Sequence, residues 1–154
     1  MEKKLKKLSK KVNIFLNRYL SKFNSSELVV PMKYGLFPGG KKIRSKIIFD
    51  VGKIFRVKNK DLMFLAASVE AIHAYSLIHD DLPCMDDDNL RRGKPSTHIK
   101  FGESTAILAG NSLLTTAFEI LSDKSFKVDD KIKSNLIHAL SRCSGQIGIA
   151  GGQY

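Results

Sequence analysis

The stretch DLMFLAASVEAIHAYSLIHDDLP, residues 61–83, decides the fold of this chain. Apolar residues recur along it at helical spacing, at Leu62, Leu65, Val69, Ile72 and Ile78. Asp61 is placed to cap the start of a helix, and Pro83 ends it because proline lacks the amide hydrogen and clashes with the preceding turn. The sequence therefore predicts a long helix from about Asp61 to Pro83 that packs against other helices.

Similar stripes lie on both sides of this helix. The predicted helices cover residues 1–22, a short segment within 24–40, residues 43–54 with an apolar stripe at Ile43, Ile47, Ile48, Val51 and Ile54, and residues 103–121 and 128–150. Gly110 indicates close contact between helices. Since no sustained period-two alternation, internal repeat or linker interrupts the pattern, we expect one all-α domain, a helical bundle over residues 1–154.

The composition limits the kinds of partner. With 154 residues and 43% apolar residues, the chain can bury a sizeable core. Its formal charge of +11 favours an anionic partner: nucleic acid, an acidic membrane surface or a phosphorylated substrate. The excess is mostly Lys spread along the chain and is not interleaved with exposed aromatics, so we expect no nucleic-acid partner.

Other sequence features concern the compartment. Cys84 and Cys143 are too few for a disulfide framework or a four-ligand zinc site. No uninterrupted apolar run approaches the roughly 20 residues that span a bilayer, so stable membrane insertion is not expected. The basic, amphipathic first helix could also serve as a transit peptide or a membrane-surface helix. The favoured interpretation is a cytoplasmic protein whose first helix packs on the core.

Five carboxylates gather at the end of the long helix, at Asp80, Asp81, Asp86, Asp87 and Asp88. Their mutual repulsion calls for a compensating cation, and oxygen ligands favour a hard ion such as Mg²⁺. On an ideal helix Asp80 and Asp86 would point about 120° apart. They can meet one ion only if the chain is distorted near Pro83; the alternative is a solvated acidic loop.

Basic residues flank the acidic cluster. Lys41 and Arg44 stand one turn apart after Gly39-Gly40, where the start of a helix favours an anion such as diphosphate. His73 lies two helical turns before Asp80 and on the same face. Arg91 and Arg92 follow the acids, and guanidinium groups suit bidentate contacts with phosphate. Taken singly, these residues could be a solvated helix face, a core histidine and partners that neutralise the acids.

Together these motifs resemble a known family. Residues 71–88, AIHAYSLIHDDLPCMDDD, followed by Leu90-Arg91-Arg92-Gly93-Lys94-Pro95, are similar to the first aspartate-rich motif of bacterial short-chain trans-prenyl diphosphate synthases of the farnesyl type. The segment GGKKIR at 39–44 and the segment GGQ at 151–153 match further motifs of this family. The resemblance implies the fold of the isoprenoid synthases, represented by roughly its first half.

The resemblance also implies roles for individual residues. The diphosphate of isopentenyl diphosphate would be held by Lys41, Arg44, His73 and Arg92. Asp80 and Asp86 would bind Mg²⁺ beside the allylic diphosphate, Asp81 would belong to the catalytic set, and Arg91 would contact the allylic diphosphate. The implied reaction ionises the allylic carbon–oxygen bond, attacks the cation with the isopentenyl double bond and loses a proton.

Tyr75 and Ser76, five and four residues before Asp80, resemble the positions that limit product length in this family, and the aromatic residue favours farnesyl diphosphate. Full-length members are nearly twice as long, carry a second aspartate-rich motif and usually form homodimers. We therefore expect little turnover from the 154 residues alone. The alternative is a truncated, inactive homologue or a non-catalytic subunit that binds diphosphate or pairs with a full-length synthase.

Overall fold

The computed structural model describes residues 2–37 and 40–154, and it confirms the all-α prediction. The elements in chain order are α1 (Glu2–Leu20), the 3-10 helix η1 (Ser21–Phe23), α2 (Val29–Leu36), α3 (Ile43–Ile54), α4 (Asn59–Asp80), β1 (Leu90–Arg91), β2 (Lys94–Pro95), α5 (Thr97–Phe101), α6 (Glu103–Ser122), α7 (Asp130–Ser144) and α8 (Ile149–Gln153). The two short strands pair antiparallel in a hairpin that the sequence analysis did not predict.

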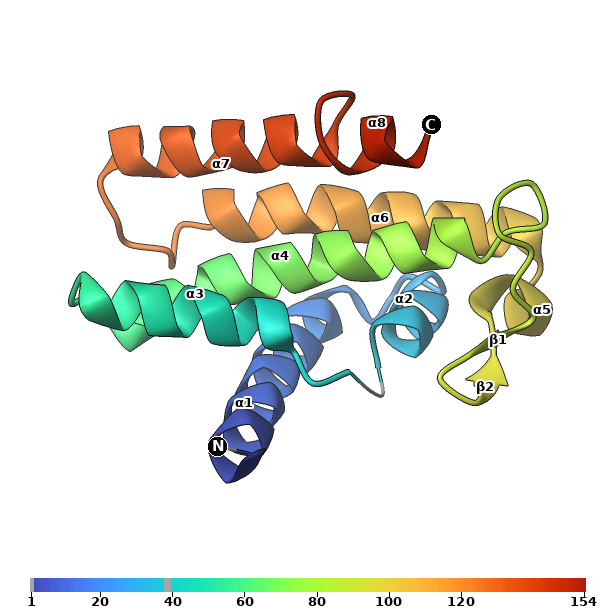
Figure 1. Cartoon of the computed structure of the whole chain (residues 1–154), viewed down its shortest axis with the longest axis horizontal. Coiled ribbons are helices and arrows are strands. Elements are labelled where there is room, and N and C mark those ends of the chain that lie inside the picture. The colour runs from blue at the N-terminus through green and yellow to red at the C-terminus, as the bar shows by residue number, and fades with distance from the viewer. Residues whose placement is uncertain (1, 38–39) are drawn as a thin grey trace.

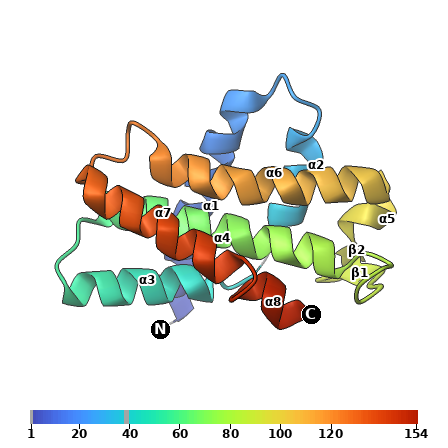
Figure 2. The ribbon, with the colours of Figure 1, turned by 90° about the horizontal axis from the view of Figure 1, so that it is seen from above.

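The helix α4 is the centre of the bundle. It lies between α3 and α6 in both views, and its most extensive packing is against α6 (Figure 1, Figure 2). The close approach predicted at Gly110 is confirmed, because a Cβ atom there would overlap the ring of His79 on α4. The core is continuous from Val12 and Leu16 of α1 to Leu113 of α6. The charged side chains of interest lie at the start of α3, in the middle and at the end of α4, and on the hairpin.

By length and composition α4 could cross a bilayer, so the expectation that no segment approaches a membrane span was too strict. Much of its surface is nevertheless buried against other helices, including Leu62, Ala66, Ala71 and Ile78. A helix in this position is the core of the bundle, and core helices share the composition of membrane spans.

Two predicted helix ends were wrong. The helix α4 begins at Asn59, so Asp61 lies in its first turn and does not cap it. The predicted helix over 128–150 is interrupted at Gly145, whose φ of −89° and ψ of −152° leave the helical region. Glycine loses helical order easily because it has no side chain to restrict its backbone. The chain resumes as the short helix α8.

The apolar stripe of α3 is largely exposed. The helix forms, but Ser45, Phe49 and Gly52 are its buried residues, while most of the predicted stripe is exposed, up to 76% at Ile54. The exposed stripe borders an open apolar groove of about 490 Å³ between α3, α4 and α7. Residues lining it include Ile47, Val51, Leu65, Ile132 and Leu136.

The face of α3 that packs on α4 can be tested directly by mutation. A Cβ atom at Gly52 would overlap the buried side chain of Leu62 on α4. Gly52→Ala gains about 1 kcal/mol of helix propensity but overpacks the interface by about 1–3 kcal/mol, so we expect a net loss of about 1 kcal/mol in urea unfolding. Gly152→Ala, in a helix with open space around the glycine, is the control. Equal stability changes in the two variants would contradict the packing of α3 on α4.

Candidate active site

Four of the predicted diphosphate ligands meet in one pocket. The start of α3 and the middle of α4 enclose a pocket of about 130 Å³. Its lining consists of Gly40, Lys41, Lys42, Ile43, Arg44, Glu70, His73 and Arg92. The structure thus brings together the basic side chains predicted at 41, 44, 73 and 92, while Gly39 of the same motif lies outside the described residues.

Gly40 is required by the shape of this pocket. Its φ of +83° is in the region that favours glycine, and a Cβ atom there would lie 2.9 Å from an Nη atom of Arg92. A side chain at residue 40 would strain this backbone and would push the flexible end of Arg92 away from the loop before α3. This gives a physical reason for the glycine in the motif.

His73 is neutral in this pocket. Its pKa is lowered from 6.5 to about 4, chiefly by burial, and the nearby charges of Arg44 and Arg92 contribute to the same shift. Glu70 acts in the opposite direction but does not outweigh these effects. A neutral imidazole can donate one hydrogen bond to a phosphate oxygen without adding charge.

This environment predicts a pH dependence. The His73 ring should titrate near pH 4, and inorganic diphosphate should raise that pKa because the anion offsets Arg44 and Arg92. The unfolded ring binds its proton near pH 6.5, so the contribution of His73 to stability is complete above pH 6.5 and is lost as the pH falls toward 4. NMR titration of the ring, assigned with His73→Gln, measures both effects. A pKa near 6.5 without ligand would contradict the burial.

Sequence reasoning missed two further residues of the pocket, Lys42 and Glu70. The Nζ atom of Lys42 lies 3.3 Å from Oε2 of Glu70, and both side chains are buried. A possible signal in the sequence was the isolated Glu70 in an apolar helix, three residues before His73 and therefore on the same face. Its partner could not be identified from spacing, because Lys42 is remote in the sequence.

The chain turns back at the end of α4. The helix ends at Asp80, and the backbone N–H of Asp86 donates a hydrogen bond to the Asp80 carbonyl, with 2.8 Å between N and O. This is the distortion near Pro83 on which the convergence of Asp80 and Asp86 depended. Burial raises the pKa of the Asp80 carboxyl, and repulsion from Asp86 raises it further. The two acids therefore interact, and a cation between them would relieve their repulsion.

These acids fit magnesium that is bound together with a substrate. In the part of the chain that the structure describes, no group of three His, Cys, Asp or Glu side chains is placed to hold a metal ion. Magnesium commonly uses one or two carboxylates and completes its coordination with phosphate oxygens and water. Asp80 and Asp86 supply such a pair, and the donor set is entirely oxygen.

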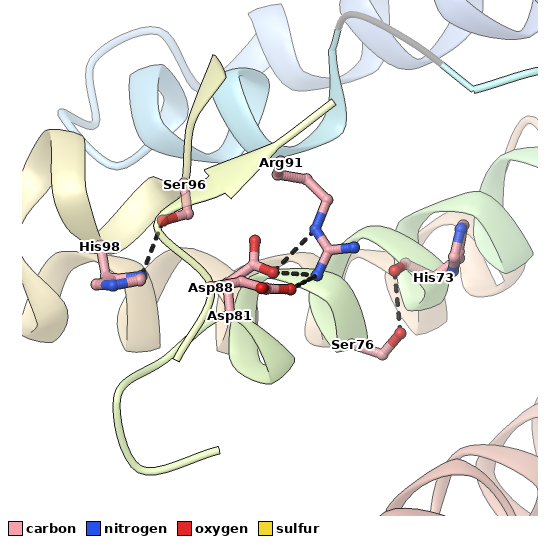
Figure 3. A network of polar contacts seen from close by, with 7 residues as sticks. All are labelled: His73, Ser76, Asp81, Asp88, Arg91, Ser96 and His98. Carbon is pink, nitrogen blue, oxygen red and sulfur yellow. Dashed lines mark hydrogen bonds and ion pairs between the residues drawn. The ribbon is translucent and has the colours of Figure 1, made fainter. Parts of the chain in front are cut away.

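Asp81 and Arg91 have a different arrangement (Figure 3). Nε of Arg91, on β1, donates to Oδ1 of the buried Asp81 at 2.8 Å, and an Nη atom of Arg91 also pairs with Asp81 and lies 3.2 Å from Oδ2 of Asp88. These bonds join the hairpin to the end of α4. Both side chains predicted to act in catalysis or binding are thus engaged with each other.

Tyr75 and Ser76 lie on α4 between the two groups of charged residues. The Tyr75 ring packs edge-on against His79 and also contacts the small apolar cluster of Ala71, Ile72 and Ala117. Ser76 donates a hydrogen bond from its hydroxyl to the His73 carbonyl at 3.1 Å. Tyr75 therefore adds bulk between α4 and α6, whereas Ser76 is bonded to its own helix.

The chain is similar to known proteins in sequence and in fold. The family model described as polyprenyl synthetase matches residues 25–153. The chain is 48% identical over 147 residues to a farnesyl diphosphate synthase of Escherichia coli, covering 94% of this chain and 49% of that protein. It is 44% identical to a farnesyl diphosphate synthase of Haemophilus influenzae, covering 97% of this chain and 51% of that protein.

Solved structures give the same result. The crystal structure of an FPP/GFPP synthase from Zymomonas mobilis matches with a TM-score of 0.88 at 38% identity, covering 99% of this chain and 57% of the other. A geranyltransferase from Legionella pneumophila matches with a TM-score of 0.85 at 35% identity, covering 99% and 55%. The helical fold predicted from the resemblance is confirmed, and the chain spans about half the length of the relatives it matches.

Proposed function

Since this chain belongs to the polyprenyl synthetase family, we propose that it forms one wall of the active site of a prenyltransferase that joins isopentenyl diphosphate to an allylic diphosphate. The observation that carries the proposal is the pocket in which Lys41, Arg44, Arg92 and a neutral His73 face a common space. Three cationic side chains and one neutral donor match an oxygen-rich, multiply charged diphosphate.

The basic pocket and the acidic pair at the end of α4 would bind different substrates. The basic pocket would hold isopentenyl diphosphate by its diphosphate group. At the end of α4, Asp80 and Asp86 would hold magnesium with the allylic diphosphate, and the bound ion would neutralise the negative charge that the departing diphosphate develops. Arg91 is bonded to Asp81 and Asp88, so its first role would be to hold the hairpin in place. Its effect on the allylic diphosphate would then be indirect, through the position of the hairpin.

The chemistry would be ionisation of the allylic carbon–oxygen bond, attack on the cation by the isopentenyl double bond, and loss of a proton. Allylic cations are quenched by water, so this reaction needs an apolar enclosure. Because the chain spans about half the length of its relatives, we propose that the other half of such a protein supplies the second wall that encloses the cation. We propose farnesyl diphosphate as the product, because Tyr75, five residues before Asp80, places an aromatic ring between α4 and α6 near the end of α4.

We propose the cytoplasm as the compartment and assign no role to nucleic acid. Cys84 and Cys143 are free and exposed, which suits a reducing environment. Homodimer formation, expected for full-length members, remains a prediction that light scattering can check.

A complementation assay tests the proposed function. The purified chain is incubated with Mg²⁺, geranyl diphosphate and isopentenyl diphosphate, with and without the C-terminal half of the Escherichia coli farnesyl diphosphate synthase as a separate polypeptide. We expect little or no turnover from the chain alone, and a fifteen-carbon product when the second half is supplied, because only then is the cation enclosed.

Three other outcomes separate the alternatives. Turnover by the chain alone would contradict the need for a second wall. Binding of isopentenyl diphosphate without turnover in either mixture would favour the non-catalytic subunit. If calorimetry detects no binding of isopentenyl diphosphate to the chain, the proposed function is wrong.

A further inference from the structure

The helix α3 is capped by a residue of another helix. Its N-cap residue, Lys42, makes no capping hydrogen bond with its own side chain. Instead, Oε1 of Glu70 on α4 accepts hydrogen bonds from the Ser45 N–H at 3.2 Å and from the Ser45 hydroxyl at 2.7 Å. A carboxylate at this position satisfies a free amide and complements the positive end of the helix dipole.

The second oxygen of the same carboxylate holds Lys42. The Nζ atom of Lys42 lies 3.3 Å from Oε2 of Glu70, and the side chains are only 5% and 3% exposed. Lys42 has a φ of +50° and a ψ of +48°, a left-handed backbone that a residue with a side chain adopts at a cost. That conformation turns Lys42 inward, while its neighbours Lys41 and Arg44 stay exposed.

We propose that Glu70 is a positioning residue of the diphosphate pocket: it holds Lys42 away from the ligand and fixes the start of α3, so that Lys41 and Arg44 meet the diphosphate. This inference rests on the proposed function for the identity of the ligand. It also changes how the anion is held. The helix N-terminus, expected from the sequence to face the diphosphate, already has Glu70 on one of its amides. Diphosphate would therefore be bound mainly by side chains.

Lysine acylation followed by mass spectrometry tests the inference without any ligand. In the native chain we expect Lys42 to react at least about tenfold more slowly than the adjacent Lys41, because reaction needs local opening of the buried pair. Glu70→Gln keeps an oxygen that can accept from Ser45 but removes the charge that holds Lys42, so Lys42 should then react at a rate close to that of Lys41. Glu27→Gln, which removes an exposed charge, is the matched control and should leave the ratio unchanged.

Inorganic diphosphate adds a functional readout. It should protect Lys41 and leave Lys42 unchanged in the native chain. In Glu70→Gln the pocket becomes more positive, which by charge alone favours the anion. A rise in the half-protection concentration, which we expect to be about tenfold, therefore reports that the released Lys42 displaces Lys41 and Arg44 from the diphosphate. Adding Lys42→Met to that variant should restore the native value, because the pair is then neutral and the cap remains. A purely stabilising role for Glu70 would lower the melting temperature and leave the half-protection concentration unchanged.

The outcomes are separable. The inference is overturned if Lys42 reacts as fast as Lys41 in the native chain, if it stays protected in a folded Glu70→Gln, or if diphosphate protects Lys42 directly. If Glu70→Gln does not fold, the ratio of the Lys42 and Lys41 reaction rates in the native chain still tests the inference. If diphosphate protects neither lysine and Lys42 still reacts slowly, the result would count against the proposed function. It would nevertheless support the pairing of Glu70 with Lys42.

Discussion

Asp80→Asn is expected to reduce Mg²⁺-dependent turnover of the complemented protein by at least about a hundredfold. The substitution keeps the shape of the side chain but removes one of the two carboxylates that interact at the end of α4. A metal ion beside a departing diphosphate is worth several kcal/mol of transition-state stabilisation, and about 2.7 kcal/mol already corresponds to a factor of a hundred. The comparison is the initial rate of product formation at saturating Mg²⁺.

The control for this prediction lies in the same loop. Asp87→Asn removes an equal charge from an exposed residue whose φ of +54° is well tolerated by Asn. We expect its turnover to remain within about threefold of the native rate, since the exposed charge is screened by solvent. If the two variants lose activity equally, the effect comes from the charge of the loop, and Asp80 is not the metal ligand. Calorimetry of Mg²⁺-dependent geranyl diphosphate binding to the chain alone gives the same comparison without turnover.

The second large effect concerns stability. Arg91→Met is expected to lower the free energy of unfolding by about 3 kcal/mol, because it leaves the buried Asp81 carboxylate without its ionic partner. The side chain of Asp81 is only 3% exposed, so water cannot replace the lost bonds. Methionine keeps the apolar stem, which confines the change to the charge and its hydrogen bonds. Urea unfolding followed by circular dichroism measures the loss.

Asp88 supplies the comparison for Arg91. Asp88→Asn breaks the other contact of the same guanidinium, but the Asp88 side chain is 52% exposed, so we expect a loss below about 1 kcal/mol. A loss below about 1 kcal/mol in Arg91→Met as well would show that the ion pair does not hold the hairpin to α4. Arg91 would then be available for the allylic diphosphate, as the family resemblance implied.

Much of the fold could be predicted because helix formation is local. The apolar residues at three- and four-residue steps placed α1, α4 and α6 within a few residues of their observed bounds, and the motifs identified the family. Boundaries were less predictable. The broken helix at Gly145 and the start of α4 at Asn59 depend on backbone and capping details that periodicity does not register.

The buried face of α3 could not be read from its own sequence. Its aliphatic stripe predicts burial, yet Ser45, Phe49 and Gly52 are the residues that pack on α1 and α4. Small residues permit the close approach of α3 to Leu62, and Ser45 finds its polar partner in Glu70. Which face of α3 is buried depends on the surfaces of α1 and α4, which are formed by other parts of the chain.

The sequence alone determined where the helices run and which acids and bases the chain offers for chemistry, since hydrogen bonds within a helix and the order of residues along it need no distant partner. Tertiary structure decided which of those groups are free. It turned Asp86 back to Asp80, engaged Arg91 with Asp81, and paired Lys42 with Glu70 across 28 residues. The physical reason is that burial and ion pairing depend on which helix surfaces are in contact. Those contacts are determined by the packing of the whole bundle.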